Sequence, residues 1–421
     1  MIWLATLLTV TEGLVPVLVM SALMGVEDMV YRMGADAFMS AVDAMNTFCS
    51  DHFLPWSEID WTSWQPPLET VTAIRFGSYH FSLKREDGGP PTNPPMVSDR
   101  TEFSIPAVIS FPDCPSLLLK TPGAGRDRAA HTLQNVMLRL LTCMPAGKVR
   151  YTIIDPLGLG QTFSAFMHLA DYDERLVTNR IWTEAAHINQ RLTDLTEHME
   201  NVIQTYLRNE FESIQDYNRH AGEVAEPFHV LVIANFPANF NEETARRLVS
   251  IATSGARCGV YTLMCVDTAM KLPRNFSLSE LERQAATLQW DGQDFYWDDP
   301  LLSQLPLKLD LPPPDNDFTA AVKTVGGFAR HANRVEVPFA TVVAEDGAWW
   351  KQDSRHGLEV ALGRSGATKL QTMQLGHGTS QHVLIAGKTG SGKSTLMHAL
   401  ITNLSISYAP QEVAFYLVDF K

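Results

Sequence analysis

The residues of this chain that are best suited to chemistry lie near its C-terminal end, where positions 387–394 read GKTGSGKS. This octapeptide is a complete G-x-x-x-x-G-K-[ST] loop, whose glycines let backbone N–H groups surround phosphate oxygens. We expect Lys393 to be the catalytic residue that reaches the β- and γ-phosphates, and Ser394 to bind Mg²⁺. The pattern predicts a site for ATP and Mg²⁺. Its predicted nucleotide contacts are Gly387, Lys388, Thr389, Gly390, Ser391, Gly392, Lys393 and Ser394.

The residues on either side of the loop predict the elements that would position it. Val383–Ala386 is a short apolar run typical of a buried strand, and Phe415–Phe420 predicts a second strand. Between them, apolar residues recur at helical spacing and fall on one face: Leu396, Met397, Leu400, Ile401 and Leu404. A chance glycine turn does not require this strand–loop–helix context, so we interpret the motif as a true phosphate loop.

The chain contains a degraded internal repeat of this pattern. The segment SLLLKTPGAGRDRAAHTLQNVML, beginning at Ser116, aligns with the segment around the C-terminal loop. The glycines of the two loops match, Gly123 with Gly390 and Gly125 with Gly392. Each copy predicts a strand, a glycine loop, a helix and a strand, so we expect two copies of one nucleotide-binding core.

The earlier copy lacks the residues that bind phosphate and magnesium. Lys120 stands at the first glycine, Arg126 at the lysine and Asp127 at the serine. An aspartate directed at a triphosphate would repel it, and the planar fork of arginine does not replace a compact ammonium. Together with Arg128, the two basic residues form a small cluster that we weigh as a site for an anion.

A second loss in the earlier copy lies at the end of the apolar strand His229–Phe236. Folds of this kind place a metal-binding Asp and a catalytic Glu there, whereas this chain has Ala234 and Asn235. Two independent losses predict a pseudo-ATPase. The alternative is that residues 112–275 form a similar α/β layer that never hydrolysed a nucleotide.

Composition places the chain of 421 residues among globular proteins, with 45% hydrophobic and 19% charged residues. A net charge of −14 argues against broad nucleic-acid contact, although a local basic channel stays possible. Five dispersed cysteines predict reduced thiols in a cytoplasmic protein. Because Glu12, Gly13 and Pro16 interrupt the apolar residues 1–25, we expect a buried or partner-facing helix there instead of a membrane span.

Strands and helices alternate through the middle of the chain. Apolar runs at Ser116–Leu119, Tyr151–Ile154, His229–Ala234 and Val260–Val266 predict strands, and the longest helix is expected over Thr183–Arg219. Alternation of this kind predicts an α/β fold with a parallel sheet whose faces are covered by helices.

The C-terminal block resembles the FtsK/SpoIIIE class of RecA-like, ring-forming ATPases. HVLIAGKTGSGKSTLMHALITNL and YLVDFK are similar to that family's loop-through-second-strand block, and ALGRSGATKLQTMQLGHGTSQ resembles its β-rich lead-in. The earlier copy has a fainter likeness in Glu197–Glu200, in Asp216–Asn218 and in the SGARCGV that precedes Val260–Val266. Asp267 stands at the position of the family's polar sensor residue. Residues 1–60 are not covered by the likeness.

The resemblance implies an ATP-driven motor that moves double-stranded DNA through a hexameric ring of its own subunits. A branch of similar tandem ATPases moves polypeptides in type VII secretion, and the acidic net charge weakly favours a protein partner. A non-catalytic scaffold is the third hypothesis. A cytoplasmic location is implied, with any membrane association made through partners.

The patterns along the sequence, together with the resemblance over residues 112–275 and 355–421, predict a division of the chain. The sequence also departs from the family in one respect. We expect a helical segment at 1–54, a linker and β-rich lead-in at 55–111, a degenerate RecA-like domain at 112–275, a linker with a helix and short strands at 276–354, and an incomplete active domain at 355–421. The sequence stops at Lys421, just after the second predicted strand of that domain. We expect its Walker B and sensor residues beyond Lys421, in a longer protein that is an ATPase, whereas these 421 residues bind ATP without efficient hydrolysis.

Overall fold

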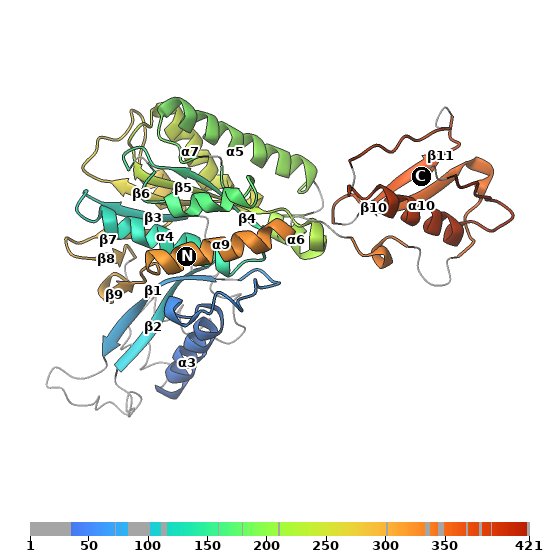
Figure 1. The fold of residues 1–421 in the computed structure, drawn as a ribbon. Helices are drawn as coiled ribbons and strands as arrows, with labels where there is room; N and C mark the ends of the chain where they lie inside the picture. Colours follow the sequence, from blue (N-terminus) through green and yellow to red (C-terminus); the bar gives the residue numbers. More distant parts are fainter. Residues whose placement is uncertain are drawn as a thin grey trace. The chain divides into compact units, whose positions relative to one another are not determined.

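The computed structural model describes most of the chain beyond residue 34. The described residues are 35–71, 73–82, 102–110, 116–158, 160–178, 180–208, 211–299, 302–332, 337–343, 349–367, 369–378, 381–388 and 390–418. The chain divides into two compact units, Met1–Gln215 with Glu226–Asn333, and Asp216–Ala225 with Arg334–Lys421 (Figure 1). The apolar segment 1–25 lies outside the described residues. Among those that are described, no helix is both long and apolar enough to span a membrane.

The first unit is built on a six-stranded sheet in the order β4-β5-β6-β3-β7-β8. The first five strands in this order run parallel, and β8 pairs antiparallel with β7. The bounds are β3 Ser116–Thr121, β4 Val149–Ile154, β5 Phe228–Phe236, β6 Val260–Asp267, β7 Ala286–Trp290 and β8 Phe295–Trp297. The expected α/β fold with a parallel sheet is confirmed.

Helices cover this sheet because its central strands are apolar on both faces. Leu117, Leu118 and Leu119 of β3 are fully buried, as parallel strands between two helical layers should be. Figure 1 shows α5 and α7 on one side of the sheet and α4 on the other. The helices before residue 333 are α3 Ala35–His52, α4 Arg126–Thr142, α5 Ala185–Thr205, α6 Ile214–Ala221, α7 Glu242–Ser254, α8 Ser279–Glu282 and α9 Asp315–Ala332.

The single long helix expected over Thr183–Arg219 is wrong, because the structure has two helices there, α5 and α6. The chain turns after α5 and buries Leu207, which is 3% exposed, and Ile214, which is fully buried. Burying each side chain stabilises the fold by about 1.5–3 kcal/mol, which offsets the helical hydrogen bonds lost at the turn. Helical periodicity alone does not show this turn.

A three-stranded antiparallel sheet packs beside the large one. Its order is β2-β1-β9, with β1 at Ala73–Ser82, β2 at Glu102–Ser110 and β9 at Leu307–Leu309. Gly77 is required in β1, because a Cβ atom there would lie 2.5 Å from the Lys308 carbonyl oxygen of β9. The helix α3 packs on β2 and is the described part of the helical segment expected at the N-terminus.

Beside the segment Asp216–Ala225, the described residues of the second unit form a β-hairpin, one long α-helix and short 3₁₀ helices at Phe339–Thr341 and Ser354–His356. The hairpin pairs β10 Leu358–Arg364 with β11 Leu370–Leu375, and the helix α10 spans Lys393–Ser407. Val360, Leu404 and Tyr408 form its buried core. The hairpin forms where the β-rich lead-in was expected, and α10 confirms the helix expected after the glycine loop.

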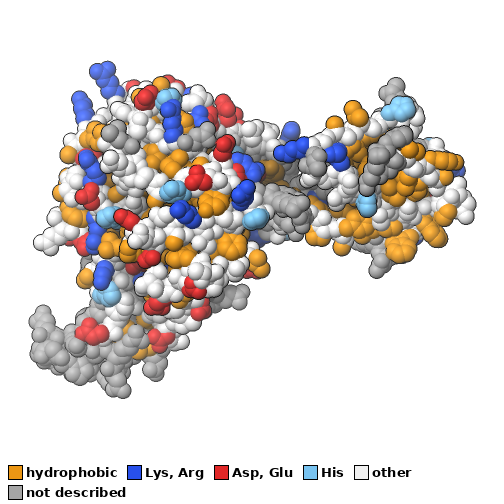
Figure 2. Space-filling model, in the orientation of Figure 1, with side chains coloured by type: hydrophobic (Ala, Val, Ile, Leu, Met, Phe, Trp, Pro, Cys, Tyr) orange, Lys and Arg blue, Asp and Glu red, His pale blue; other side chains and the backbone are white. Residues whose placement is uncertain are grey.

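The strands expected at Val383–Ala386 and Phe415–Phe420 are not formed in the described residues, so this prediction was wrong. A strand needs hydrogen bonds from a neighbouring strand, and none among the described residues pairs with either segment. Their apolar side chains are instead exposed, with Leu384 at 92% and Tyr416 at 93%. Figure 2 shows hydrophobic side chains on the surface of this unit.

Candidate functional site

The C-terminal glycine loop adopts a compact conformation at the start of α10. Gly390 and Gly392 have φ angles of 81° and 87°, in the left-handed region that glycine adopts at little cost. The Lys393 ammonium donates hydrogen bonds to the backbone oxygens of Gly387 at 2.7 Å and Lys388 at 2.9 Å. The lysine therefore folds back into its own loop. Thr389 lies outside the described residues.

The start of α10 and the Lys393 ammonium together create a positive electrostatic potential at an exposed surface. Lys393 is the first residue of α10 and Ser394 the second, so the free N–H groups of the helix start lie beside the ammonium. A helix N-terminus of this kind binds phosphate. Within the described part of the chain, no hydrogen bond or ion pair joins an Asp or Glu side chain to the loop. The geometry suits phosphate binding.

The equivalent loop of the first unit lies at the carboxyl end of β3. There β3 stands between β6 and β7, and its chain connection leads toward β4 on one side while that of β6 leads to β7 on the other. Ligands of open α/β sheets bind at such a switch point. The structure brings Arg126 and Asp127 together here with Ala234, Asn235 and Cys265, which line one small cavity. Arg126 and Asp127 thus lie together with Ala234 and Asn235, as the comparison of the two repeats predicts.

The basic residues of this loop are all bound to carboxylates of the same unit. Arg126 takes the place of the phosphate-binding lysine, but it pairs with the nearly buried Asp267 at the end of β6. These pairs compensate the charges of the basic cluster, which argues against the anion site that we weighed there. The pairs are Arg126–Asp267 at 3.0 Å, Lys120–Glu282 at 2.7 Å and Arg128–Asp294 at 3.2 Å.

Asp155 is a polar residue of this cluster to which the sequence alone assigned no functional role. It follows β4 and is fully buried, and its Oδ1 accepts hydrogen bonds from Gly158 N at 2.9 Å and Asn235 Nδ2 at 3.1 Å. Asn235 has a φ angle of 59°, a costly conformation for a residue with a side chain. The signal that could have found Asp155 is its place directly after a buried strand, at the edge where β3 and β5 also end.

The cavity at this cluster has a volume of about 180 Å³, below the 300–1,000 Å³ typical of small-molecule sites. Gly125 lies so close to Trp290 that a Cβ atom there would be 2.7 Å from the indole ring. Burial raises the pKa of the Cys265 thiol to about 12, so this wall of the cavity presents no thiolate at neutral pH. The fold thus confines this cavity, and the charge of Arg126 is neutralised by Asp267.

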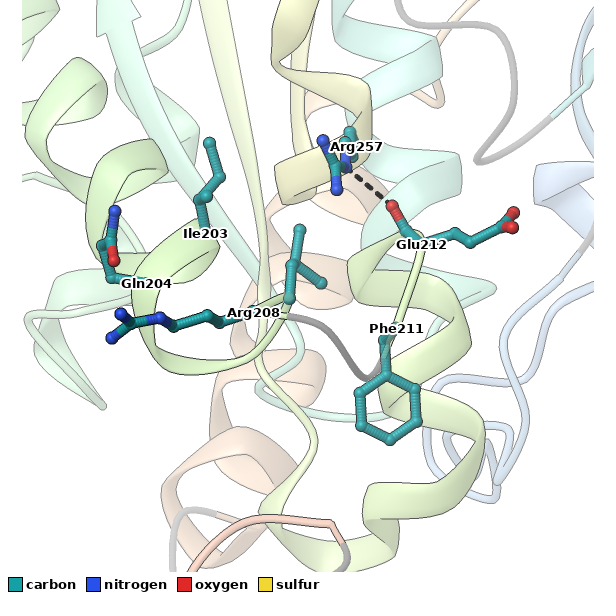
Figure 3. A pocket seen from close by; sticks show the side chains of 7 residues that line it. Ile203, Gln204, Arg208, Phe211, Glu212 and Arg257 are labelled. Atoms are coloured by element: carbon teal, nitrogen blue, oxygen red, sulfur yellow. Dashed lines mark hydrogen bonds between the residues drawn. The ribbon is translucent and has the colours of Figure 1, made fainter.

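The first unit also has two larger hollows among its described residues. A cleft of about 880 Å³ runs between α4, the 3₁₀ helix η4 at Ser164–Asp171, and the start of α9, and Asp127 lines both this cleft and the small cavity. An open pocket of about 630 Å³ lies beside the end of α5 (Figure 3). In it, Arg257 Nε donates to the Glu212 carbonyl oxygen at 2.7 Å, and the pocket has no glycine loop in its lining.

The glycine loop, its lysine and α10 have the sequence pattern and the loop–helix arrangement of a P-loop. The FtsK/SpoIIIE family matches residues 342–421, which include the hairpin, the loop and the helix. This match confirms the resemblance of the C-terminal block to the FtsK/SpoIIIE family, over residues 342–421.

Curated relatives of this part are secretion proteins by name. Type VII secretion system protein EssC of Staphylococcus aureus (strain NCTC 8325 / PS 47) is 38% identical over 76 residues, 17% of this chain and 5% of that protein. ESX secretion system protein EccC of Geobacillus thermodenitrificans (strain NG80-2) is 37% identical over 76 residues, with the same shares. The chain thus spans only about 5% of the length of these relatives.

Solved structures similar to a larger share of the chain are more distant. EssC (ATPases 2 and 3) from Geobacillus thermodenitrificans has a TM-score of 0.44 at 13% identity, over 82% of this chain and 66% of that one. The cytoplasmic domain of the Thermomonospora curvata type VII secretion ATPase EccC has a TM-score of 0.43 at 17% identity, over 86% and 46%. The α/β fold is assigned from the strand order of the structure, and not from these similarities.

Proposed function

We propose that residues 387–394 bind ATP with Mg²⁺ and that this chain is the ATP-binding part of an FtsK/SpoIIIE-type motor. The observation that supports this most directly is the Lys393 ammonium held inside the loop at the start of α10. Phosphate oxygens would replace the two carbonyl oxygens as its partners, and Ser394 would offer its hydroxyl to Mg²⁺. The glycines and N–H groups of the loop complete the phosphate contacts.

Within this proposal, the motor acts on a polypeptide. The relatives of the P-loop segment are named as secretion proteins, and the net charge of −14 is unsuited to broad contact with phosphates. On the face shown in Figure 2, Lys and Arg side chains of the first unit are interspersed with Asp and Glu. The second candidate is the movement of double-stranded DNA, favoured by the family match. Ring assembly and a cytoplasmic location, with membrane association through partners, belong to both candidates.

The first unit has a non-catalytic role in this proposal. Its loop residue Arg126 is paired with Asp267, and Ala234 and Asn235 stand where a hydrolytic site needs carboxylates. The cavity at this loop measures about 180 Å³, below the 300–1,000 Å³ typical of small-molecule sites, which supports this role. We therefore assign nucleotide binding to the second unit alone.

Replacement of the loop lysine tests the binding site. Lys393→Ala should weaken binding of a fluorescent ATP analogue at least about tenfold, because charge-assisted hydrogen bonds contribute about 1.5–3 kcal/mol. Lys351→Ala, which removes an exposed lysine of the same unit, is the matched control and should bind as the unchanged chain does. Equal affinity of the two variants would refute the assignment.

Two further measurements separate the candidate substrates. The chain should bind double-stranded DNA only weakly at moderate salt, and purified residues 1–421 should show no steady-state ATP turnover. Tight DNA binding that falls steeply with salt would favour the DNA motor over the polypeptide motor. Sustained turnover would contradict the view that the described residues lack a catalytic carboxylate.

A further inference from the structure

Three side chains with metal-binding atoms meet near the amino end of β5. His198 comes from α5, His229 from the start of β5, and Glu226 from the segment just before it. One nitrogen or oxygen of each residue lies within 4.8 Å of the corresponding atoms of the other two. Two ligand atoms at 2.0–2.2 Å from one Zn²⁺ lie no more than about 4.4 Å apart, so small side-chain rotations bring all three into coordination range.

The two histidines leave buried nitrogen atoms without a partner. Their rings are stacked with centroids 4.0 Å apart and planes 29° apart. The Nε2 atoms of both His198 and His229 are buried and have no hydrogen-bond partner among the described residues. Buried polar atoms are nearly always satisfied, and a missing ion is one of the recognised reasons for an exception. The unsatisfied pair is therefore an observation independent of the cluster itself.

The third member of the cluster is held in place by its surroundings. Tyr206, which directly follows α5, donates its hydroxyl to Glu226 Oε2 at 3.2 Å. Hydrogen bonds of this kind orient carboxylate ligands in metal sites. Arg150 of β4 acts electrostatically on Glu226 and on both histidines, and its positive charge opposes a cation. The expected affinity is thus lower than for an isolated set of the same ligands.

We propose that His198, Glu226 and His229 form a site for a divalent transition metal ion, with Zn²⁺ as the best match. Two imidazoles and one carboxylate are a common Zn²⁺ ligand set, and a water molecule can take the fourth position. The ion would tie α5 to the amino end of β5. It would lie at the opposite end of β5 from Asn235, and its binding is independent of the proposed nucleotide site.

Metal titration of the chelator-treated chain tests the site directly. Isothermal titration with Zn²⁺ should give one ion per chain, and Co²⁺ should give the intense visible absorption of four-coordinate cobalt. His198→Ala and His229→Ala should each weaken binding more than about tenfold, since even the loss of an outer-shell partner costs 10–100-fold. Glu226→Gln keeps the size of the side chain, and it should weaken binding while retaining the fold.

The matched control is His187→Ala, which removes an exposed histidine from the same helix. Zn²⁺ should raise the thermal midpoint of this variant as it does that of the unchanged chain, because a ligand that binds only the folded state stabilises it. The midpoint of His198→Ala should not move. If no Zn²⁺ binds, or if His198→Ala and Glu226→Gln bind it as tightly as His187→Ala does, the proposal is overturned.

Discussion

Lys393 and Arg126 occupy the same structural position with different consequences. Each is the first residue of a helix that follows a glycine loop, and a glycine, Gly392 or Gly125, stands just before it. The lysine bonds to backbone oxygens, which an incoming phosphate can displace, whereas the arginine bonds to the carboxylate of Asp267. The same site in the fold is therefore available to an anion in one copy and neutralised in the other.

The Arg126–Asp267 pair should contribute to stability and not to nucleotide binding. Arg126→Ala leaves the carboxylate of Asp267, whose side chain is 8% exposed, without its charged partner and should lower the free energy of unfolding by about 1–2 kcal/mol. Adding Asp267→Asn should recover part of this loss, because the uncompensated charge is then removed. Urea unfolding of the single and double variants measures the coupling.

A second measurement is the ATP affinity of variants of Arg126. We expect Arg126→Ala and Arg126→Lys to bind the nucleotide as the unchanged chain does. If either variant gained a new or tighter ATP site, the salt bridge alone would be what keeps the nucleotide out of the first unit. That result would contradict the role that we assign to the small size of the cavity.

At the scale of the element, two neighbouring glycines of α9 should respond oppositely to alanine. A Cβ atom at Gly326 would lie 2.4 Å from the Tyr172 ring, whereas none of the described atoms lies within 4 Å of one at Gly327. Gly326→Ala should cost about 1–3 kcal/mol through overpacking, and Gly327→Ala should stabilise the chain by about 0.5–1 kcal/mol through helix propensity. Thermal unfolding of the two variants provides the comparison, and equal effects would contradict the packing of α9 described here.

The contact between α5 and β5 should make stability depend on pH. Burial holds the pKa of His229 well below its ordinary value, and burial also lowers that of His198. The fold thus favours the neutral form of both rings, so near and below the ordinary imidazole pKa of about 6.5 the unfolded chain binds more protons. With a chelator present, the free energy of unfolding should be constant above that pH and fall as the pH decreases toward 5. His229→Gln should flatten this dependence.

Sequence reasoning located the elements of the first unit better than their ends. Apolar runs such as Ser116–Leu119 predict buried strands because a parallel strand is apolar on both faces. The break between α5 and α6 depends on which side chains the turn buries, and the strands expected at Val383–Ala386 and Phe415–Phe420 depend on neighbours that the described residues do not supply. Residue propensities do not show which side chains a turn buries, and they do not show which strands are neighbours.

The candidate sites divide in the same way. The P-loop pattern could be recognised in the sequence, because it consists of residue types at fixed spacing along one short segment. The salt bridge from Arg126 to Asp267 and the cluster of His198, Glu226 and His229 join residues far apart in the sequence. No local pattern contains such contacts, so only the folded chain reveals them.

For the whole molecule, the two compact units predict two unfolding transitions. Each unit has its own core, that of the second being Val360, Leu404 and Tyr408. ATP with Mg²⁺ should raise the midpoint of the second unit alone, by the equivalent of about 2.7 kcal/mol at a concentration of 100 times the Kd. Scanning calorimetry with Lys393→Ala as the control tests this, and a nucleotide-dependent shift of both transitions would contradict independent units.

The position of β3 in the middle of its sheet also has a consequence for biosynthesis. β3 leaves the ribosome early, yet its neighbours β6 and β7 follow far behind it, and Gly77 of β1 pairs with Leu309 of β9, about 230 residues later. At a synthesis rate of roughly 5–20 residues per second, β3 waits roughly 7–35 seconds for β6 and β7, and β1 waits roughly 10–50 seconds for β9. The nascent chain should therefore be a chaperone client during that interval, and mutations that delay translation before residue 309 should lower its soluble yield without altering its final stability.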